Sequence, residues 1–563
     1  MSSAAPAPKN RQALVPVGVG VTVAAVAAFC RAPGLLYADS GELLTAVARK
    51  GVAHPPGFPL YIFLGGLFLD ATRFLGGSDA SRLNLFSSLS GGVAAGAAAF
   101  AALLLFRRTK VALPAGIVAL FAALAGFLVG FSPTLFDFSL GIEVYALHMA
   151  FVATTVALAV AAGGEPDAGR RRRLTLLSGV FAGGALAIHH ATIVVALPGV
   201  ALLLWGDEDR RSRTRRAGLF ALGLVPGLLS YVVLPLRAAR WPALNWGNPS
   251  NLYRFFTHVT AKDYQVNIES NLSTILEHAA RFVEAYRAEF TVVGLLLAAF
   301  GAVAFFKKGA FAGAALALLV AGDVAFAVRY EIAEDQAAYY LPTFLATSLL
   351  LVLGLSALVS RLLSVNRRLA VGLATAAAAA LLAFAGLNAL SRAERRHDGR
   401  ADESARDLLA ALPPGALGFT PEWNLAAPAM ALQDVEHVRE DAIVLDLLLL
   451  RRGWYLDSFR HRYPERYAEV KDAFDAYRTK LADWEEGRPF VADELTRLYE
   501  TFTRRLAEEA WKRGMDVVWF GTVMSSHLPK GAALVPTGLG YRILPSAVEA
   551  ARPVEDAPLF LRA

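Results

Sequence analysis

The stretch that decides the fold is residues 170–216, RRRRLTLLSGVFAGGALAIHHATIVVALPGVALLLWGDEDRRSRTRR, an apolar run between two clusters of arginine. The run from Leu174 to Trp205 is too long for one membrane helix, because about 20 residues rising 1.5 Å each already cross roughly 30 Å of hydrocarbon. Both clusters are expected in the cytoplasm, where short loops are rich in Lys and Arg. The sequence therefore predicts two short crossings, with the polar segment from Ile188 to Thr192 on the opposite side.

Apolar runs of spanning length recur through the first 390 residues. They lie near residues 84–106, 112–131, 144–162, 217–236, 289–306, 310–329, 341–360 and 369–390. The first run, Leu14 to Cys30, follows Lys9 and Arg11 as in a signal peptide, but Phe29 stands where lipoprotein cleavage needs a small residue. We expect this run to remain as the first transmembrane helix, with the N-terminus in the cytoplasm.

One further apolar run, Phe58 to Leu75, is expected to lie on the membrane surface or to re-enter the membrane from outside. The N-terminal tail and the basic cluster Arg107 to Lys110 are both placed in the cytoplasm by their charge, so only two crossings fit between them. The prolines at 55, 56 and 59 favour an interfacial helix entered by a rigid turn. With the other basic clusters, including Lys307 and Lys308, inside, the prediction is a polytopic α-helical membrane protein with about 11 transmembrane helices.

The composition supports this class and excludes others. Of the 563 residues, 55% are hydrophobic and 18% are charged, which is too apolar for a mainly soluble protein. The net charge of +7 sits in short clusters between apolar runs rather than on one basic face, so no nucleic-acid partner is expected. The single cysteine, Cys30, excludes an intramolecular disulfide and a cysteine-based zinc site.

Two domains are predicted. Residues 1–390 form the transmembrane domain, with outside loops at residues 31–83, 132–143 and 237–288. Residues 391–563 form a soluble extracytoplasmic α/β domain, because short apolar runs typical of buried strands alternate there with helical stretches. Strands are expected at 415–420, 441–446 and 516–520, and helices at 467–484 and 493–513.

The first outside loop carries the catalytic candidates, Asp39 and Glu42, and then His54, a candidate substrate-binding residue. If Asp39 begins a helix, both carboxylates lie on its first turn, where the helix dipole favours their ionised forms. The alternative interpretation is an N-cap with its capping-box glutamate. The two interpretations are compatible.

The other outside segments supply candidate substrate-binding residues, because the same argument from basic clusters places them on the same face of the membrane. They are Glu143, Tyr145, His148, His190, Arg237, Asn245 and Trp246. Arg237 is either a phosphate ligand at headgroup level or an interfacial arginine, and Trp246 is either a belt aromatic or a platform for sugar stacking. Asp323, inside a predicted crossing, has no evident outside position: it either pairs with Arg329 in a structural role or keeps a transporter function open.

A family resemblance rests on several of these motifs. An acidic residue after the first crossing, a His-Pro-Pro turn, an interfacial helix and then Arg82-Leu-Asn84 resemble the GT-C glycosyltransferase architecture. The motifs DSGE at 39–42, HPPGFP at 54–59, EVYALH at 143–148, LPLR at 234–237 and LNW at 244–246, with His190, look like the family that includes the vertebrate O-mannosyltransferase transmembrane protein 260. The resemblance covers about residues 31–340.

This resemblance implies a bacterial multi-pass enzyme of the cytoplasmic (inner) membrane. It transfers a sugar, mannose or another hexose, from a polyprenyl-phosphate donor to a protein Ser/Thr or glycan hydroxyl on the outer face, with inversion. Asp39 is the preferred base, and Arg237, with His54 or His190, stabilises the phosphate left on the lipid.

No cofactor is expected from this chemistry, because arginine can supply the positive charge beside the phosphate. A divalent-metal site made by Asp39, Glu42 and Glu143 is possible but not favoured. The competing functional class is a non-enzymatic transporter or flippase of a lipid-linked sugar. Transporters place polar groups at the middle of the membrane, whereas these acidic residues concentrate at outer helix ends.

Overall fold

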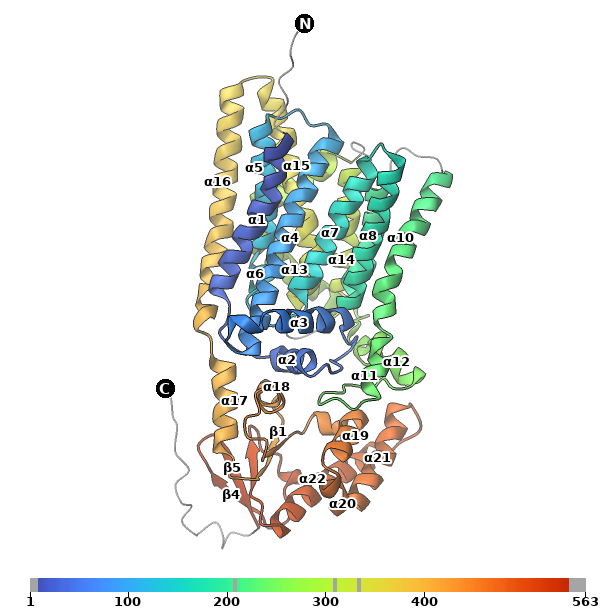
Figure 1. Cartoon of the computed structure of the whole chain (residues 1–563), viewed down its shortest axis with the longest axis vertical. Coiled ribbons are helices and arrows are strands. Elements are labelled where there is room, and N and C mark those ends of the chain that lie inside the picture. Colours follow the sequence, from blue (N-terminus) through green and yellow to red (C-terminus); the bar gives the residue numbers. More distant parts are fainter. Residues whose placement is uncertain (1–8, 206–209, 307–310, 332–335, 546–563) are drawn as a thin grey trace. The chain divides into compact units, whose positions relative to one another are not determined.

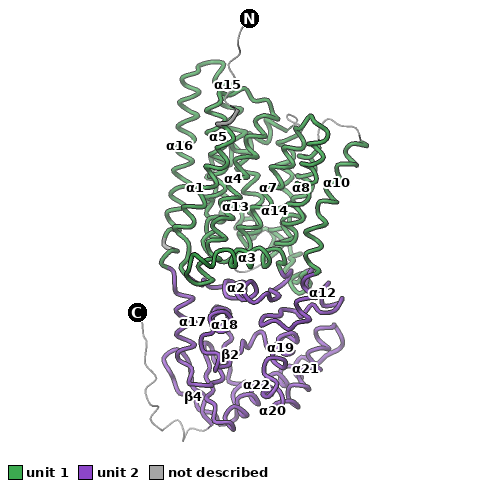
Figure 2. The backbone as a smooth tube through the Cα atoms, in the orientation of Figure 1, with its two compact units in different colours: residues 1–33, 58–232, 261–397 green, residues 34–57, 233–260, 398–563 purple. Residues whose placement is uncertain are grey.

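The structure, a computed structural model, describes residues 9–205, 210–306, 311–331 and 336–545. The chain divides into two compact units, coloured separately in Figure 2. Unit 1 comprises residues 1–33, 58–232 and 261–397, and unit 2 comprises residues 34–57, 233–260 and 398–563. This division cuts across the predicted domains, because two segments from the predicted outside loops belong to the same unit as the C-terminal region.

Within the described residues, every run predicted to cross the membrane overlaps a helix of unit 1, which is a bundle of the following α-helices. They are α1 (Lys9–Cys30), α3 (Pro59–Ala71), α4 (Asp79–Thr109), α5 (Ala115–Gly130), α6 (Pro133–Phe138), α7 (Tyr145–Gly164), α8 (Ala168–Ile188), α9 (His190–Leu204), α10 (Arg210–Ser230), α13 (Leu272–Ala304), α14 (Ala312–Ala327), α15 (Leu341–Leu363) and α16 (Arg367–Ser391). Within the described residues, seven helical stretches are long and apolar enough to cross a membrane, and α5, α9 and α14 are shorter apolar helices. The chain is a polytopic α-helical membrane protein, as predicted.

Small residues let the helices of unit 1 approach closely. A Cβ atom on Gly92 of α4 would lie 2.6 Å from the Gly20 carbonyl oxygen of α1, and one on Gly227 of α10 would lie 2.0 Å from the Gly183 carbonyl oxygen of α8. Both distances are below any allowed contact, so only glycine permits these crossings. Packing through small residues is typical of helices in lipid, where burial of apolar surface gives little driving force.

The helix α3 lies across the direction of its neighbours α1 and α4 (Figure 1). It has 13 residues, fewer than a spanning helix needs, and Pro59 occupies its first turn. This arrangement agrees with the predicted non-spanning helix between residues 58 and 75.

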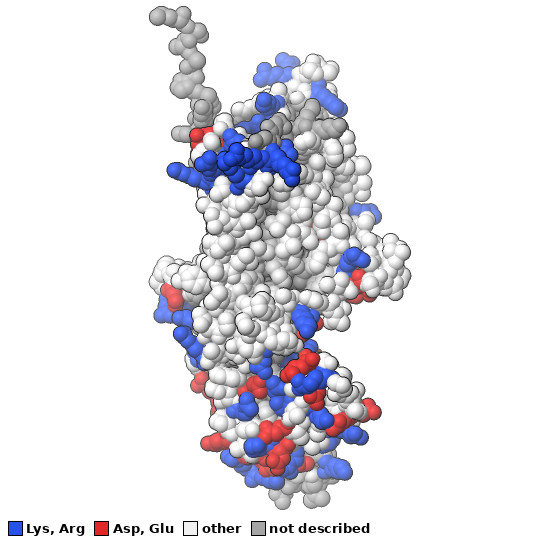
Figure 3. All heavy atoms as spheres, turned by 90° about the vertical axis from the view of Figure 1, so that its right-hand side faces the viewer, with Lys and Arg blue, Asp and Glu red and all other residues white. Residues whose placement is uncertain are grey.

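Basic side chains gather at one end of unit 1 in Figure 3, beside a broad uncharged surface. Arg107 and Arg108 lie in the last turn of α4, and Arg361 lies in the last turn of α15. Lys307 and Lys308 lie outside the described residues. The concentration of positive charge at one end is the distribution that the topology prediction requires.

Two helices of unit 1 differ in detail from the predicted spans. The helix α13 begins at Leu272 rather than near residue 289, and its helical backbone is interrupted at Thr291, where φ is 59° and ψ is 163°. The long run from Leu174 to Trp205 divides into α8 and α9 as predicted, with only His189 in extended backbone between them.

Unit 2 is an α/β unit built around a five-stranded sheet. Its elements are α2 (Ser40–Ala48), α11 (Val233–Ala238), α12 (Leu252–Val259), α17 (Arg400–Ala411), β1 (Leu417–Thr420), α18 (Trp423–Asp434), β2 (Ile443–Asp446), α19 (Gly453–Arg462), α20 (Pro464–Glu469), α21 (Lys471–Glu485), α22 (Ala492–Lys512), β3 (Val517–Phe520), β4 (Ala533–Pro536) and β5 (Gly540–Leu544). The strand order is β2-β1-β3-β5-β4, with β2, β1 and β3 parallel and the other two pairings antiparallel.

The three predicted strands are confirmed as β1, β2 and β3, and the two predicted helical stretches as α20 with α21, and α22. These strands are apolar runs that place Phe419, Leu445 and Trp519 in the core. The strands β4 and β5 were not predicted: of their residues only Ile543 is buried, the others being half-buried or exposed, and a proline ends β4.

Candidate active site

Asp39 lies at the start of α2, in unit 2, and an indole from α18 holds its carboxylate. The Nε1–H of Trp423 donates to Asp39 Oδ1 over 3.1 Å. The Asp39 side chain is 27% exposed, and its other oxygen, Oδ2, lies 3.8 Å from His54 Nε2. One oxygen is therefore fixed by a neutral donor, while the side chain stays accessible to a substrate.

Glu42 lies one turn further along α2 and is fully buried beneath His54. Its Oε1 accepts the His54 backbone N–H over 2.6 Å, and its Oε2 lies 2.8 Å from His54 Nδ1. Asp39 makes no side-chain cap to α2, so the capping-box alternative is wrong. The two carboxylates meet at one imidazole instead, and Glu42 fixes the ring that faces Asp39.

Close packing of α2 on α18 brings Asp39 to Trp423. A Cβ atom on Gly41 would lie 2.2 Å from the Ala427 carbonyl oxygen, so the DSGE motif needs glycine at this position. The Asn424 side-chain oxygen accepts the Ala38 backbone N–H over 2.8 Å, immediately before Asp39. The start of α2 is thus fixed on both sides by α18.

The third predicted loop adds Arg237, Asn245 and Trp246 to the same unit. Arg237 Nη1 donates to the Gly51 carbonyl oxygen over 3.3 Å, and Val52 pairs with Asn245 in a short parallel bridge. The Trp246 ring lies 5.9 Å from the His54 ring, edge to face. Asp39, Glu42, His54, and these three residues therefore belong to one connected structure.

The remaining predicted site residues lie in unit 1. His148 is buried in α7, with Nε2 2.8 Å from Thr192 Oγ1 and Nδ1 3.2 Å from the Ala185 carbonyl oxygen. Tyr145 packs against the His189 ring at 5.4 Å, and Glu143 is half-buried just before α7. His190 begins α9. Both ring nitrogens of His148 are thus engaged within unit 1, and the substrate contacts of this group stay predictions.

Two tryptophans of the site were missed by sequence reasoning. Trp423 follows β1 directly, and Trp454 in α19 stacks on Trp246 with ring centroids 4.8 Å apart. The segment Pro421-Glu-Trp-Asn424 directly after a buried strand was the available signal, because loops at strand ends commonly carry functional side chains. The separation of 384 residues between Trp423 and Asp39 gave no local pattern to read.

A metal ion has candidate ligands in unit 2. Asp39, Glu42 and His54 each offer one ligand atom, and these atoms lie within 4.8 Å of one another. The metal site considered from the sequence had Glu143 as its third ligand. Glu143 lies in unit 1, and His54 takes its place in this set. Both oxygens of Glu42 already contact His54, so an ion there would share this carboxylate with the imidazole and the backbone N–H of His54.

Substituting Glu42 is expected to change how stability depends on pH. Burial raises the pKa of Glu42, so the folded state holds this proton more tightly than the unfolded state does. Stability from this group is therefore largest at low pH and falls as pH rises through the raised pKa. In Glu42→Gln that loss is removed, so the difference in melting temperature between variant and parent should shift in favour of the variant as the pH rises above the ordinary glutamate pKa of 4.5.

The measurement is thermal unfolding of both proteins in the same detergent at pH values from that pKa upward. Other titrating groups are common to both proteins and cancel in the difference. Parallel curves would show that Glu42 keeps an ordinary pKa in the folded protein.

Comparison with known proteins relates this site to one family. Residues 39–213 match the family model for the protein O-mannosyl-transferase TMEM260 N-terminal domain. This match includes Asp39, Glu42 and His54 but ends before Arg237.

Two relatives carry the same name. The chain is 27% identical over 472 residues to the protein O-mannosyl-transferase TMEM260 of Mus musculus, covering 80% of this chain and 64% of that protein. It is 23% identical over 287 residues to the Dictyostelium discoideum protein O-mannosyl-transferase tmem260, covering 48% of this chain and 34% of that protein. The chain thus spans less than two thirds of the length of either relative.

Among solved structures, ArnT from Cupriavidus metallidurans bound to undecaprenyl phosphate has a similar fold. The TM-score is 0.50 at 16% identity, and the match covers 78% of this chain and 91% of that one. The matching domain and the two relatives make the chain similar to the TMEM260 family, and its fold is of the GT-C type.

Proposed function

We propose that this protein is a membrane glycosyltransferase that moves a hexose, mannose in the first instance, from a polyprenyl-phosphate donor to a hydroxyl acceptor. The observation that carries the proposal is the Asp39 carboxylate, fixed on one oxygen by Trp423 and exposed beside His54. The relatives named protein O-mannosyl-transferase and the neighbour bound to undecaprenyl phosphate support the choice of sugar and donor.

The chemistry needs a base on one side of the sugar and a cation on the other. The acceptor oxygen attacks the anomeric carbon of the sugar, and Asp39 takes the acceptor proton as the new glycosidic bond forms. The bond from the anomeric carbon to the phosphate oxygen breaks, and the electron pair leaves with the lipid phosphate. Attack opposite the leaving group inverts the anomeric configuration.

Arg237 is the cation that we assign to the leaving phosphate. Its guanidinium reaches the backbone at Gly51, three residues before His54, so the cation and the base lie on segments tied to each other. A guanidinium presents five donors in a fork that suits phosphate oxygens, and one of these donors is used by Gly51. Glu42 acts through His54, as a positioning residue for the groups around Asp39.

Orientation follows from the basic end of unit 1. We place that end and the N-terminus in the cytoplasm, in the cytoplasmic membrane of a bacterium, because positive loops are retained inside. By the topology predicted from the sequence, the loops that carry residues 39–54 and 237–246 are expected on the outer face.

The deciding experiment is transfer of radiolabelled sugar by the purified protein. Polyprenyl-phosphate mannose and its glucose and arabinose equivalents are each offered with a serine/threonine-rich peptide pool and with a membrane-glycan fraction. Transfer to either acceptor supports the proposal and names the donor. Saturable donor binding without any transfer would contradict it and favour a carrier of the lipid-linked sugar.

The structure weakens one argument for such a carrier. Asp323, the carboxylate inside a predicted crossing, does not pair with Arg329 as expected. Its Oδ2 accepts from the Thr343 backbone N–H over 3.0 Å and from Thr343 Oγ1 over 2.7 Å. These contacts give Asp323 a role in joining α14 to α15.

Removal of divalent metal is expected to leave transfer intact. Arg237 supplies the positive charge beside the phosphate, and both oxygens of Glu42 already contact His54. The check is the transfer rate before and after EDTA treatment. Loss of transfer in EDTA and its return on adding Mg²⁺ or Mn²⁺ would assign a metal to Asp39, Glu42 and His54.

A further inference from the structure

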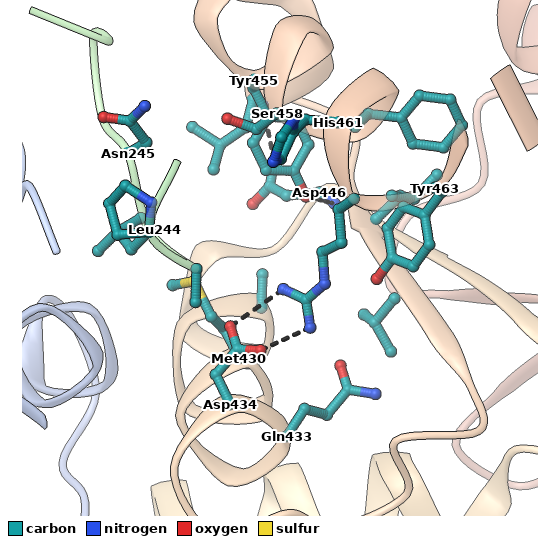
Figure 4. A pocket seen from close by; sticks show the side chains of 18 of the residues that line it. Leu244, Asn245, Met430, Gln433, Asp434, Asp446, Tyr455, Ser458, His461 and Tyr463 are labelled. Carbon is teal, nitrogen blue, oxygen red and sulfur yellow. Dashed lines mark hydrogen bonds and ion pairs between the residues drawn. The ribbon is translucent and has the colours of Figure 1, made fainter. Parts of the chain in front are cut away.

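A cavity of about 350 Å³ lies within unit 2, next to the Asp39 site. Figure 4 shows its side chains converging from the third predicted loop, α18 and α19, with Asp446 at the end of β2. Trp423 and Asn245 line this cavity and also belong to the Asp39 site. The cavity therefore shares a wall with the proposed catalytic residues, and its volume is that of a small-molecule site.

Asp446 lines this cavity, and one of its two carboxylate oxygens lacks a hydrogen-bond donor among the described residues. It is 3% exposed, and its Oδ1 accepts the Leu449 backbone N–H over 2.8 Å. Its Oδ2 is buried and has no hydrogen-bond partner among the described residues. Carboxylate oxygens accept and never donate when ionised, so this atom calls for a ligand that brings a donor.

The charged side chains around Asp446 do not supply a donor to its Oδ2 atom. Arg462, which also lines the cavity, is held by Asp434 through two hydrogen bonds of 3.1 and 2.5 Å. Burial raises the pKa of Asp446 to about 6, and Glu422 adds a like charge. The carboxylate is thus kept at a cost to stability, which is expected of a group retained for binding.

Flat aromatic surfaces form much of the remaining lining. Trp241 stacks on His461 with ring centroids 4.8 Å apart and an angle of 17° between the rings. Trp454 and Tyr455 lie on α19, and Trp454 stacks on Trp246. Aromatic faces beside a carboxylate acceptor suit a pyranose ring, which offers apolar C–H faces and hydroxyl donors at its edge.

We propose that this cavity binds a hexopyranose unit of a glycan acceptor, with a sugar hydroxyl donating to Asp446 Oδ2 and the ring lying against the tryptophans. This inference rests on the proposed function and adds the acceptor class to it. A peptide acceptor fits the observations less well, because peptides are usually read along a groove or a free strand edge, whereas this cavity is walled by five separate segments.

The test is saturation-transfer NMR with the full chain in lipid nanodiscs. The probes are methyl α-mannopyranoside, α-glucopyranoside and α-galactopyranoside, and, as the peptide alternative, N-acetyl-threonine methylamide. At least one glycoside should bind, and Asp446→Asn should weaken that binding at least tenfold. Asp472→Asn, which changes an exposed aspartate of α21 outside the cavity, is the matched control and should bind like the parent.

Thermal unfolding separates binding from folding in the same variants. The Asp446→Asn substitution keeps an oxygen for the Leu449 N–H and removes the buried charge, so this variant should melt no lower than the parent at pH 7. A stable variant that has lost the glycoside supports the proposal. Three results would each overturn the proposal. They are equal glycoside binding by Asp446→Asn and the parent, binding of the threonine probe alone, and binding of none of the probes.

These outcomes are independent of sugar transfer, because the NMR measurement uses no donor. Transfer without glycoside binding would contradict only the assignment of the cavity. Glycoside binding without any transfer would contradict only the proposed enzyme activity.

Discussion

Asp39→Asn is expected to lower the rate of sugar transfer by about 10²- to 10⁴-fold, the usual contribution of a positioned general base. The amide keeps an oxygen that can accept from Trp423 Nε1 but cannot take the acceptor proton. Folding and donor binding should be preserved, because the substitution is isosteric and Asp39 is partly exposed. The measurement is initial-rate transfer from polyprenyl-phosphate mannose, or from whichever donor proves active.

The control for this variant is Asp472→Asn, which makes the same chemical change at an exposed site on α21. It should transfer at the rate of the parent protein. Activity of Asp39→Asn within a few-fold of the parent would remove Asp39 from the role of base. His54, its neighbour at 3.8 Å, would then be the next residue to test.

Arg237→Gln is expected to lower transfer by about 10²- to 10³-fold, the cost of removing one group that stabilises developing negative charge. The charge on the leaving phosphate grows as its bond to the sugar breaks, so the loss should fall mainly on kcat. Arg237→Lys should recover part of the rate, because lysine restores the charge without the fork of donors.

Arg240→Gln serves as the matched control, because Arg240 is exposed and lies only three residues further along the chain. Kinetics of the two glutamine variants, measured over a range of donor concentrations, separate kcat from KM. An equal and small effect of both substitutions would make Arg237 an interfacial arginine, which is the alternative interpretation of its position.

Much of unit 1 followed from the sequence, because the bilayer imposes a simple rule on it. Apolar runs of spanning length and clusters of basic residues predicted each crossing helix and the non-spanning helix α3. The start of α13 was predicted too late, because its first half, from Leu272, carries charged residues and extends outside the apolar run. Hydropathy detects the apolar part of a helix, not the whole of it.

The site was predicted only in part, for a physical reason. Asp39, Glu42 and His54 are close in sequence, and the motif alone placed them together. The separate tasks of Asp39 and Glu42 depend on burial, since Glu42 is enclosed and satisfied by His54 while Asp39 keeps an exposed side chain. Trp423 comes to Asp39 through the packing of α2 on α18, which no local pattern reports.

The packing of Gly41 against Ala427 has a consequence for how such proteins can diversify. The base proposed for catalysis is held by a residue encoded far downstream, in the region that also forms the cavity. A C-terminal region therefore cannot be exchanged as an independent module for one with a different preference. New acceptor preferences are expected to arise by point substitutions around the cavity. The hydrogen bond from Trp423 and the packing of α18 on the start of α2 would be retained.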